Sequence, residues 1–435
     1  MSFHPRLATE TNAAPSAGFE TVAIVGLGYI GLPTAAVMAS RGVNVVGIDI
    51  NKRVVDTINR GEIHIVEPLL DQTVKGAVEA GRLRAVTAAA PADAFLIAVP
   101  TPINTDKRAD LSYVMSATDL IAPVLKRGDL VILESTSPVG TTEKVAARLA
   151  EQRPDLRIPT RGSAEAPVDV NVAYCPERVL PGKVVEELVA NDRAIGGLTT
   201  ACTERAIKFY RLFVHGELVA TDARSAELCK LAENACRDVN IAFANELANV
   251  CETMSMDVWE VIRLANRHPR INILKPGAGV GGHCIAVDPW FIVEAAPRDT
   301  PVLQAARHVN DGRPERAFKK IQALATEWIA SNQRQPRLAL LGIAFKPNID
   351  DIRESPAVDI VRMVAQAQLG QVLVVEPHIS ALPASLADLG AELVGLDKAR
   401  AAADIVVLLV DHDAFKGVSH SEGATQVVHA ICRPL

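Results

Sequence analysis

The stretch Thr21-Val-Ala-Ile-Val-Gly26-Leu-Gly28-Tyr-Ile-Gly31-Leu-Pro decides the fold of this chain. Its short apolar opening predicts a buried strand, and the segment after Gly31 has a helical pattern that ends at Gly42. Gly26 permits a tight turn, Gly28 lets a pyrophosphate approach the backbone, and Gly31 lets the helix pack on the strand. The helix N-terminus then offers N–H groups and a positive dipole end to that phosphate.

An acidic residue strengthens this interpretation. Asp49 closes the second predicted strand, residues 43–48. A carboxylate there accepts hydrogen bonds from ribose hydroxyls and repels a 2′-phosphate, so the expected cofactor is NAD rather than NADP. A glycine-rich turn without a ligand is the minor alternative. The cofactor residues predicted from this motif are Gly26, Gly28, Tyr29, Ile30, Gly31 and Asp49.

Further strands alternate with helical patterns, which is typical of a parallel sheet. Residues 223–265 contain no glycine or proline and repeat apolar residues every three or four positions, so they predict one long helix or two. The other expected strands are 94–99, 129–134, 171–175, 193–196, 337–343, 372–375 and 405–410.

This order of elements predicts an α/β fold. We expect two Rossmann-like doubly wound parallel-sheet domains joined by a long central helical region. The expected parts are a flexible tail at 1–20, a dinucleotide-binding domain at 21–220, a helical domain with the reactive cysteine at 221–330, and a last α/β domain at 331–435.

Composition excludes several classes of protein. The net charge of −6 and the lack of a basic stripe argue against a nucleic-acid binder. No apolar stretch reaches the roughly 20 residues needed to span a bilayer, and residues 1–20 lack the apolar core of a signal peptide. Seven scattered cysteines fit neither a disulfide framework nor a zinc site. We therefore expect a cytoplasmic protein without a metal.

Cys284 stands out in the run Gly279-Val-Gly-Gly-His-Cys-Ile-Ala-Val-Asp-Pro-Trp. Gly281 and Gly282 would let a substrate come close. A helix that starts near Cys284 would lower the pKa of the thiol, although Asp288-Pro289 could instead begin a later helix. An isolated cysteine is more often a buried, inert thiol, but the glycine-rich approach makes Cys284 a candidate nucleophile.

Other polar residues form weaker candidates. Lys230 and Asn234 share one helix face and could stabilise an oxyanion, although a solvated pair is the more frequent reason for this spacing. Thr136 and Glu177 follow strand ends, where the ligand crevice of an open α/β sheet lies. A carboxylate such as Glu177 could activate a water, but both could be ordinary turn residues.

The last domain offers two cations after its first strand. Lys346 and Arg353 lie in Phe345-Lys-Pro-Asn-Ile-Asp-Asp-Ile-Arg-Glu-Ser-Pro and are suited to phosphates. An ordinary charged loop is the alternative.

Taken together, these motifs resemble the UDP-sugar 6-dehydrogenase family (the UDP-glucose/GDP-mannose dehydrogenases) from about residue 21 to the last domain. The resemblance implies an NAD-binding domain, a central helical domain that forms a homodimer or larger homo-oligomer, and a UDP-binding domain. The motifs are Gly-x-Gly-Tyr-Ile-Gly-Leu-Pro, Ser-Thr-Ser-Pro-Val-Gly, Pro-Glu-Arg, Lys230 with Asn234, Gly-Gly-His-Cys and Phe-Lys-Pro-x-x-x-Asp-x-Arg-Glu-Ser.

The resemblance also implies roles for single residues. Cys284 would be the nucleophile, Lys230 and Asn234 would stabilise oxyanions, Asp288 and Thr136 would hold a water, and Glu177 would serve thioester hydrolysis. Thr101, Thr136 and Arg353 would contact the cofactor. The implied substrate contacts are Glu177, Arg178, Leu180, Lys230, Asn234, Gly281, Lys346 and either Arg267 or Arg270, the last reaching the substrate of the partner subunit. Pro181 stands where many UDP-glucose enzymes have a second acid.

Residues 257–291 most resemble the enzymes that oxidise UDP-N-acetyl-D-mannosamine. UDP-glucose enzymes usually differ where this chain has Arg178, His283 and Val287, whereas UDP-N-acetylglucosamine enzymes share Gly-Gly-His-Cys. The implied reaction oxidises C6 of a UDP-N-acetylhexosamine to the uronate with two NAD⁺, for a surface polysaccharide precursor. The alternatives are a 6-dehydrogenase of UDP-N-acetylglucosamine or UDP-glucose, a single-step hydroxyacid dehydrogenase, which yields one NADH, and a sensor that binds both ligands without turnover.

Overall fold

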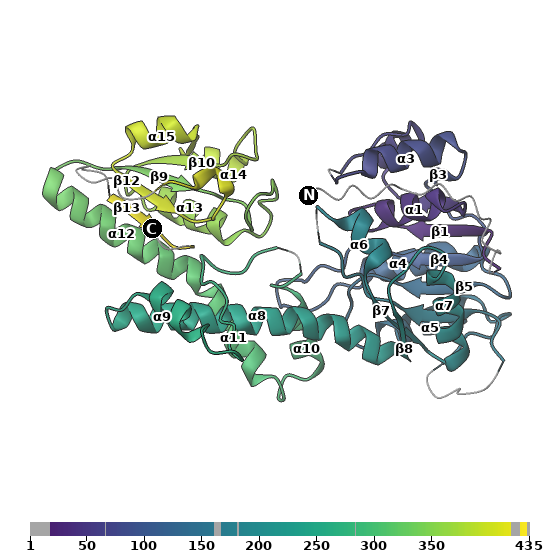
Figure 1. Ribbon diagram of the computed structural model, residues 1–435. Coiled ribbons are helices and arrows are strands. Elements are labelled where there is room, and N and C mark those ends of the chain that lie inside the picture. The colour runs from purple at the N-terminus through teal and green to yellow at the C-terminus, as the bar shows by residue number, and fades with distance from the viewer. Residues whose placement is uncertain are drawn as a thin grey trace. The chain divides into compact units, whose positions relative to one another are not determined.

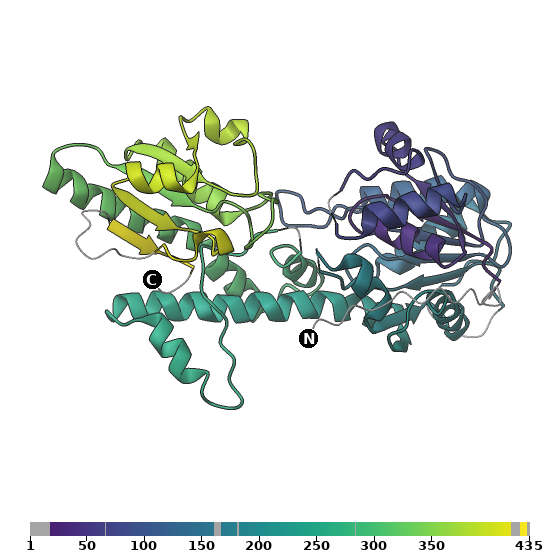
Figure 2. The ribbon, with the colours of Figure 1, turned by 45° about the horizontal axis from the view of Figure 1, so that its top comes forward.

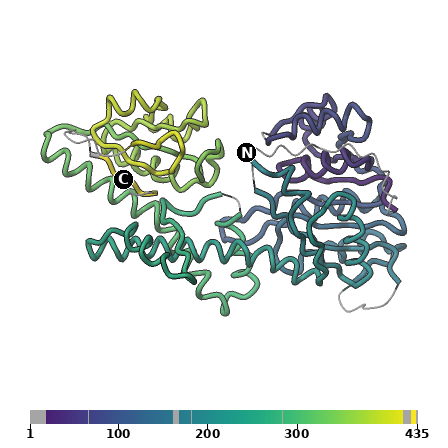
Figure 3. Tube along the Cα trace, in the orientation of Figure 1, coloured from purple at the N-terminus to yellow at the C-terminus, as the bar shows by residue number. Residues whose placement is uncertain are grey.

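A computed structural model describes residues 18–65, 67–160, 167–180, 182–282, 284–418 and 427–432. It contains two compact units, Met1–Leu231 and Ala232–Leu435, and the division falls inside the long helix α8 (Ala223–Thr253). Figures 1 and 3 follow the chain through both units. Most of the expected tail, together with Pro181 and His283, lies outside the described residues. Among the described helices, none is both long and apolar enough to cross a membrane.

The first unit is built on an eight-stranded sheet with the order β3-β2-β1-β4-β5-β6-β7-β8. The strands β2 and β3 are added on one side of β1, and β4 and the strands after it are added on the other side. Ligands of open α/β sheets bind at such a switch point in the strand order. The strands are β1 (Thr21–Val25), β2 (Asn44–Ile48), β3 (Leu83–Val86), β4 (Ala94–Ile97), β5 (Leu130–Leu133), β6 (Asn171–Tyr174), β7 (Arg193–Gly197) and β8 (Leu218–Asp222).

Helices cover both faces of this sheet (Figure 1). Because both faces are covered, the central strands are almost wholly apolar, as the sequence indicated. One face holds α1 (Gly31–Ser40), α2 (Lys52–Asn59), α3 (Leu70–Glu79), α6 (Val184–Ala190) and α7 (Thr200–Tyr210). The other face holds α4 (Ser112–Ile121), α5 (Thr141–Gln152) and the first turn of α8, with a 3-10 turn at Ala122–Val124.

One pairing differs from the parallel sheet that the sequence predicted. β7 runs antiparallel to β6, with Ala173 opposite Gly197 and Tyr174 opposite Gly196. This reversal brings the start of β7 to the edge where the parallel strands end. The residue there is Arg193, which lies beside the segment that follows β6.

The second unit holds the rest of α8, a group of shorter helices and a five-stranded parallel sheet with the order β11-β10-β9-β12-β13. The predicted helical stretch 223–265 is two helices, because Ser255 adopts a left-handed conformation (φ +54°) and Asp257 caps the second helix. Figure 2 shows α8 as one continuous rod. The helices are α9 (Val258–Ala265), α10 (Asp288–Ala295), α11 (Pro301–Asp311) and α12 (Arg313–Asn332).

The second sheet is also covered on both faces. α12, α13 (Pro356–Gln366) and α14 (Ala384–Ala387) pack on one side, and α15 (Leu396–Ala402) with a 3-10 turn at Asp413–Phe415 packs on the other. The predicted α/β fold class is thus confirmed. The strands are β9 (Arg337–Leu341), β10 (Gln371–Val375), β11 (Glu392–Leu393), β12 (Ile405–Leu408) and β13 (Val427–Ala430).

Candidate active site

The glycine motif has the geometry that a dinucleotide requires. Gly26 has φ +92°, and a Cβ there would lie 2.6 Å from the Ala98 carbonyl oxygen. A Cβ on Gly31 would lie 1.8 Å from the Gly26 carbonyl oxygen. By contrast, no described atom lies within 4 Å of a Cβ placed on Gly28. The outer glycines therefore serve close packing, whereas Gly28 leaves its backbone open to a phosphate.

Two further features of this turn fit NAD. No side chain caps α1 at its N-cap residue, Ile30, so its first turn keeps a positive end for a pyrophosphate. Asp49 Oδ2 accepts a hydrogen bond from Leu27 N at 3.0 Å, and its Oδ1 accepts one from Asn51 N at 2.8 Å. The carboxylate is thereby fixed beside the glycine turn. Tyr29 in the same turn is 45% exposed.

The loops after β4 and β5 are tied together. Thr101 Oγ1 donates a hydrogen bond to the Thr136 carbonyl oxygen at 2.5 Å, and Ser135 Oγ donates to the Val99 carbonyl oxygen at 2.7 Å. The structure therefore brings together the two threonines that the resemblance assigns to the cofactor. Both lie at the carboxyl edge of the sheet, where the crevice of such folds is found.

The start of α8 is anchored by an acid that the sequence did not single out. The buried Glu227 accepts hydrogen bonds from Gly140 N at 2.6 Å, Thr142 N at 2.8 Å and Thr142 Oγ1 at 2.6 Å. Burial raises the pKa of Glu227, and these donors oppose the rise. Glu227 thus fixes α8 on the first turn of α5, one turn before the half-buried Lys230.

Three predicted catalytic residues meet within the second unit. Asn234 Nδ2 donates a hydrogen bond to Asp288 Oδ2 at 2.5 Å, and Asp288 is buried. The Cys284 carbonyl oxygen accepts hydrogen bonds from Val287 N at 3.0 Å and Asp288 N at 2.9 Å. Cys284 itself is exposed. Asn234 is therefore no solvated surface amide, and it fixes the carboxylate that follows the cysteine turn.

The helix after Cys284 starts later than one expectation required. α10 begins at Asp288, with Pro289 in its first turn. The alternative start at Asp288-Pro289 is correct, because a proline fits the first turn of a helix. The dipole of α10 therefore does not act directly at the Cys284 thiol, since this effect is confined to the first turn.

The glycines before Cys284 make a close contact within the chain that the sequence did not predict. A Cβ on Gly281 would lie 2.4 Å from the Glu354 carbonyl oxygen, and one on Gly282 (φ +82°) would lie 3.0 Å from the Phe345 ring. The segment 279–282 thus packs tightly on the loop 345–356, which includes Lys346. Close approach of another part of the chain therefore explains why neither position carries a side chain.

The glycine loop begins at Gly277, and both backbone groups of this residue are hydrogen-bonded to side chains. Gly277 N donates a hydrogen bond to Asn245 Oδ1 at 2.9 Å, and the Gly277 carbonyl oxygen accepts one from Arg313 Nε at 2.9 Å. Burial lowers the pKa of Arg313 to about 10. Asn245 and Arg313 therefore fix the loop that ends in Cys284, and no short motif indicated either residue.

The two predicted phosphate-binding cations differ. Arg353 makes a bidentate pair with Asp351, with Nε–Oδ1 at 2.9 Å and Nη2–Oδ2 at 2.7 Å. Lys346 Nζ lies 5.8 Å from the centroid of the Phe345 ring. The ammonium of Lys346 is thus presented on a loop that is itself packed against the cysteine segment.

Glu177 lies in a buried ionic cluster at the carboxyl edge of the first sheet. Its Oε1 accepts a hydrogen bond from Arg178 N at 2.5 Å, and its Oε2 lies 3.4 Å from both Nη1 and Nη2 of Arg193. Glu177 is 8% exposed and Arg193 is 2% exposed. An ordinary turn residue would not be held in this way. Arg193 was not predicted from the sequence, because its strand was expected to be parallel.

The remaining predicted contacts are at the surface. Leu180 is 60% exposed, and Arg267 and Arg270 are both exposed in the segment after α9. The single chain brings neither arginine to the residues described above, and the two remain equal candidates for a role in a partner subunit.

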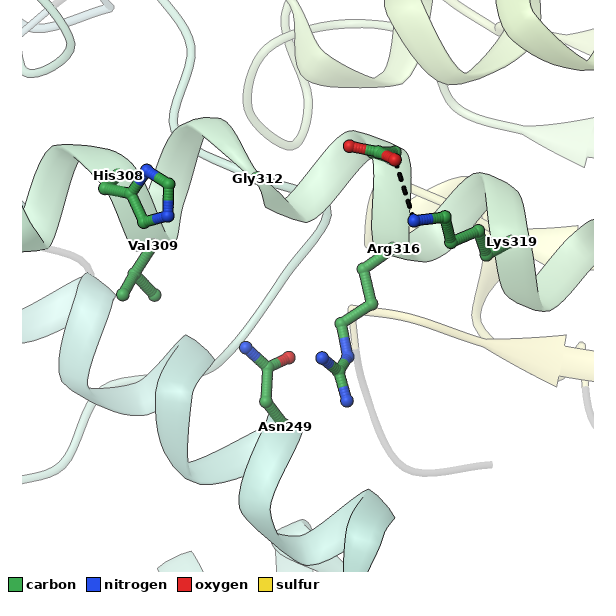
Figure 4. Close-up of a pocket in the computed structure, with 7 residues that line it drawn as sticks. Asn249, His308, Val309, Gly312, Arg316 and Lys319 are labelled. Carbon is green, nitrogen blue, oxygen red and sulfur yellow. Dashed lines mark ion pairs between the residues drawn. The ribbon is translucent and has the colours of Figure 1, made fainter.

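A hollow of the second unit lies elsewhere, among α8, α11 and α12 (Figure 4). Its volume is about 290 Å³, and its Lys319 pairs with Glu315 at 2.7 Å. Its described lining includes none of the predicted site residues, so it has no place in this site. The lining residues are Asn249, His308, Val309, Gly312, Glu315, Arg316 and Lys319.

Comparison with known proteins places this geometry in a family. Three family models match in order: the NAD-binding domain of the UDP-glucose/GDP-mannose dehydrogenase family at residues 20–214, its central domain at 224–312 and its UDP-binding domain at 339–434. The chain belongs to the UDP-glucose/GDP-mannose dehydrogenase family. It is therefore an NAD-dependent oxidoreductase with a UDP-binding domain, as its sequence motifs predicted.

Individual relatives are similar over nearly their whole length. The chain is 57% identical over 404 residues to the UDP-N-acetyl-D-mannosamine dehydrogenase of Escherichia coli (strain K12), covering 92% of this chain and 96% of that protein. It is also 57% identical over 410 residues to the NDP-N-acetyl-D-galactosaminuronic acid dehydrogenase of Ralstonia nicotianae, covering 94% and 95%. The solved UDP-D-ManNAc dehydrogenase of Pyrococcus horikoshii is 36% identical, with a TM-score of 0.83 and coverage of 94% and 99%.

Proposed function

We propose that this enzyme oxidises C6 of UDP-N-acetyl-D-mannosamine to the uronate and reduces two NAD⁺ in the process. The observation that carries the proposal is the meeting of Asn234, Asp288 and the Cys284 turn within one unit. Relatives named for this substrate are 57% identical to the chain over 92% of its length. A single-step hydroxyacid dehydrogenase has no use for the cysteine turn or for a UDP-binding domain.

Cys284 supplies the covalent step in this proposal. Its sulfur adds to the C6 aldehyde, so that a C–S bond forms and the carbonyl oxygen becomes the hydroxyl of a thiohemiacetal. NAD⁺ accepts the hydride at each of the two oxidations. Loss of the second hydride and of the hydroxyl proton leaves a thioester on Cys284. Water then attacks this carbonyl, the C–S bond breaks, and the thiol and the carboxylic acid are released.

Other residues manage charge and protons. We assign to Lys230 and Asn234 the stabilisation of the oxyanions that form at C6. Asp288, held by Asn234, and Thr136 hold a water and assist removal of the first hydroxyl proton. Glu177 takes a proton from the water that hydrolyses the thioester. Lys346, Arg178, Leu180 and Gly281 are proposed to contact the substrate, and Arg353 the cofactor.

The sugar epimer has a second candidate. The Ralstonia relative, which is named for an N-acetyl-galactosamine-type substrate, is as similar to this chain as the mannosamine enzymes are. We therefore propose the galactosamine epimer as the alternative. An N-acetylhexosamine is common to both.

We further propose a cytoplasmic homodimer. The seven free cysteines suit a reducing compartment. Large apolar side chains are exposed along α8, along α9 and in the turn between them, and exposed apolar side chains of this kind are typical of an interface. They are Phe243, Val250, Met254, Met256 and Leu264. Phe243→Asp should shift the mass measured by light scattering towards that of one chain, whereas Val302→Asp, an exposed apolar site on α11, should leave it unchanged.

An NADH assay across four substrates tests the proposal. UDP-N-acetyl-D-mannosamine, its glucosamine and galactosamine epimers and UDP-glucose are each supplied, and the charge of the product is measured. We expect the highest kcat/KM with the mannosamine sugar, with two NADH for each uronate. A preference for the galactosamine sugar selects the second candidate. Activity confined to UDP-glucose, or one NADH per sugar, contradicts the proposal.

A further inference from the structure

Four side chains form a buried cluster beneath Glu177 in the first unit. Glu134 follows β5, Cys175 follows β6, Arg193 begins β7 and Tyr210 ends α7. None of the four is more than 2% exposed. Burying a charged guanidinium and a carboxyl group costs free energy unless each is paired. We therefore expect the polar groups of this cluster to be paired, and the pairing to serve a function.

The contacts converge on Arg193. Its Nη1 and Nη2 both lie 3.4 Å from Glu177 Oε2, and its Nη2 also donates a hydrogen bond to the Leu188 carbonyl oxygen at 3.2 Å. Its Cζ lies 5.1 Å from the centroid of the Tyr210 ring. Tyr210 Oη donates a hydrogen bond to Glu134 Oε1 at 2.6 Å. The Leu188 carbonyl oxygen and the Tyr210 ring thus contact the guanidinium of Arg193, and its two terminal nitrogens lie near Glu177.

The electrostatics of the cluster depend on one cation. Burial raises the pKa of Glu134 to about 7, Arg193 opposes that rise, and Glu177 adds to it. Burial raises the pKa of the Cys175 thiol to about 12, so this thiol is neutral at physiological pH. Without Arg193, the mutual repulsion of Glu134 and Glu177 would act in a region of low dielectric, and ionisation of both would be strongly disfavoured.

The antiparallel strand explains how the cation reaches this place. Arg193 is the first residue of β7, and β7 is reversed relative to β6. In a parallel arrangement, the first residue of the strand would lie at the opposite edge of the sheet. The reversal therefore puts a cation at the carboxyl edge, beside the residue that follows Cys175 and Pro176.

We infer that Arg193 is a positioning residue that fixes the carboxylate of Glu177 for hydrolysis of the thioester. The Tyr210 ring lies beside the guanidinium of Arg193, and Glu134 accepts the hydrogen bond of the Tyr210 hydroxyl. The inference rests on the hydrolytic role that we propose for Glu177. In this step Glu177 takes a proton from water, the oxygen of the water bonds to the acyl carbon, and the C–S bond breaks. The leaving thiolate then takes up a proton, which restores the thiol. Arg193 touches neither the water nor the acyl group.

Trapping of the acyl-enzyme tests this inference. Wild type, Glu177→Gln, Arg193→Met and Arg193→Lys are mixed with UDP-N-acetyl-D-mannosamine and NAD⁺, acid-quenched and weighed by intact mass spectrometry. We expect Glu177→Gln to slow hydrolysis about 100-fold and Arg193→Met about 10-fold. Both should show a rapid burst of two NADH per subunit and an accumulated acyl adduct. Arg193→Lys should restore part of the hydrolysis rate that Arg193→Met loses. The pH profile of hydrolysis in Arg193→Lys should be displaced from that of the wild type.

A matched arginine serves as the control. Arg205 lies in the same unit with its Cζ 3.9 Å from the centroid of the Phe19 ring. Arg205→Met removes a packed guanidinium without touching Glu177, so it should leave hydrolysis unchanged. The double variant Arg193→Met with Glu177→Gln should hydrolyse no more slowly than Glu177→Gln alone, because Arg193 acts through Glu177.

The outcomes separate the inference from the function beneath it. If Glu177→Gln accumulates the adduct and a folded Arg193→Met does not, the inference is wrong and the proposed function stands. If Arg193→Met does not fold, Arg193→Lys and Tyr210→Phe decide, and hydrolysis at the wild-type rate in both contradicts the inference. If Glu177→Gln itself leaves no adduct, the role of Glu177 is wrong and the inference falls with it.

Discussion

The two sheets of this enzyme share one plan and use it differently. The order β3-β2-β1-β4-β5 of the first sheet is repeated as β11-β10-β9-β12-β13 in the second. Each first strand leads into a glycine with positive φ, Gly26 or Gly342, whose N–H donates at 2.8 Å to the last residue of the neighbouring strand. The acid that follows that neighbour, Asp49 or Glu376, accepts hydrogen bonds from the turn after the glycine.

The two turns differ in how many hydrogen-bond acceptor sites remain open on the carboxylate of each acid. Asp49 is half-buried and receives one backbone N–H on each oxygen. Glu376 is 4% exposed, and its Oε2 lies 3.1 Å from Nε2 of the fully buried His412. Because His412 Nδ1 accepts a hydrogen bond from Asn348 N, a neutral His412 carries its proton on Nε2 and donates it to Glu376.

This difference has a functional meaning. Asp49 keeps acceptor capacity for ribose hydroxyls, as an NAD-binding turn requires. The carboxylate of Glu376 already takes part in hydrogen bonds with Ile343 N, Ala344 N, His378 N and the His412 ring. It thereby fixes the loop that carries Lys346. The same strand order therefore yields one turn whose acid keeps open acceptor sites and one turn whose acid is held within the unit.

The largest effect that tests this comparison is expected at Gly31. Gly31→Ala would place a methyl group 1.8 Å from the Gly26 carbonyl oxygen, so the turn cannot keep its shape. We expect NAD binding to be lost and the first unit to be destabilised by about 3 kcal/mol, measured by NAD titration and thermal unfolding. Gly28→Ala is the control, because its methyl group meets no described atom. It should weaken NAD binding with little loss of stability. Tight NAD binding by Gly31→Ala contradicts this account of the turn.

A second effect should be confined to the turn that Glu376 holds. His412→Leu removes the side-chain partner of the buried Glu376 carboxylate and leaves its three backbone donors, so we expect a loss of about 1–3 kcal/mol. Hydrogen exchange should localise the loss to β9, β10 and the loop after β9. KM for the UDP-sugar should rise while KM for NAD stays near the wild-type value. Equal changes in both constants would show that the two turns are not independent.

Two buried carboxyl groups, Glu134 in the first unit and Glu376 in the second, should respond to pH in opposite directions. Burial raises the pKa of Glu134 to about 7, so the folded state holds this proton more tightly than the unfolded state. Stability should therefore fall as pH rises from about 4.5 to 7, by at most about 3 kcal/mol from this group. Unfolding of Glu134→Gln across this range should lack that slope. An unchanged slope contradicts the prediction.

Glu376 has the opposite sign. Burial alone would raise its pKa, but the hydrogen bonds from His412 and the backbone outweigh burial and leave it below its ordinary value. Its contribution is therefore present above the unfolded pKa, about 4.3, and is lost as pH falls through the folded pKa. Acid unfolding of the second unit should begin at a lower pH in the wild type than in a variant where His412→Phe has removed the donor.

The smallest effect is expected at the open acid. Asp49→Asn keeps one acceptor oxygen and removes the charge, so KM for NAD should rise about tenfold while KM for the UDP-sugar is unchanged. Discrimination against NADP should also weaken, because the charge that repels a 2′-phosphate is gone. Initial rates with both cofactors measure this. Undiminished discrimination would show that Asp49 does not set the cofactor.

The sequence predicted the features that depend on neighbouring residues. The strands, the glycine turn with Asp49 and the cysteine run are local patterns, and the structure places the strands close to where they were expected. The pairs Arg193 with Glu177 and Glu376 with His412 were missed because each joins segments that are separated along the chain by whole helices or strands. No periodicity encodes the direction of β7. The packing of Gly281 on Glu354 was missed for the same reason, since a glycine does not reveal its neighbour.

The central claim is that Cys284 carries the sugar through two oxidations. The most direct test measures NADH and released uronate for the wild type and for Cys284→Ser with UDP-N-acetyl-D-mannosamine. We predict two NADH per uronate for the wild type, and for Cys284→Ser a first reduction of NAD⁺ without sustained release of uronate. Turnover of Cys284→Ser to free uronate at the wild-type rate would contradict the covalent mechanism.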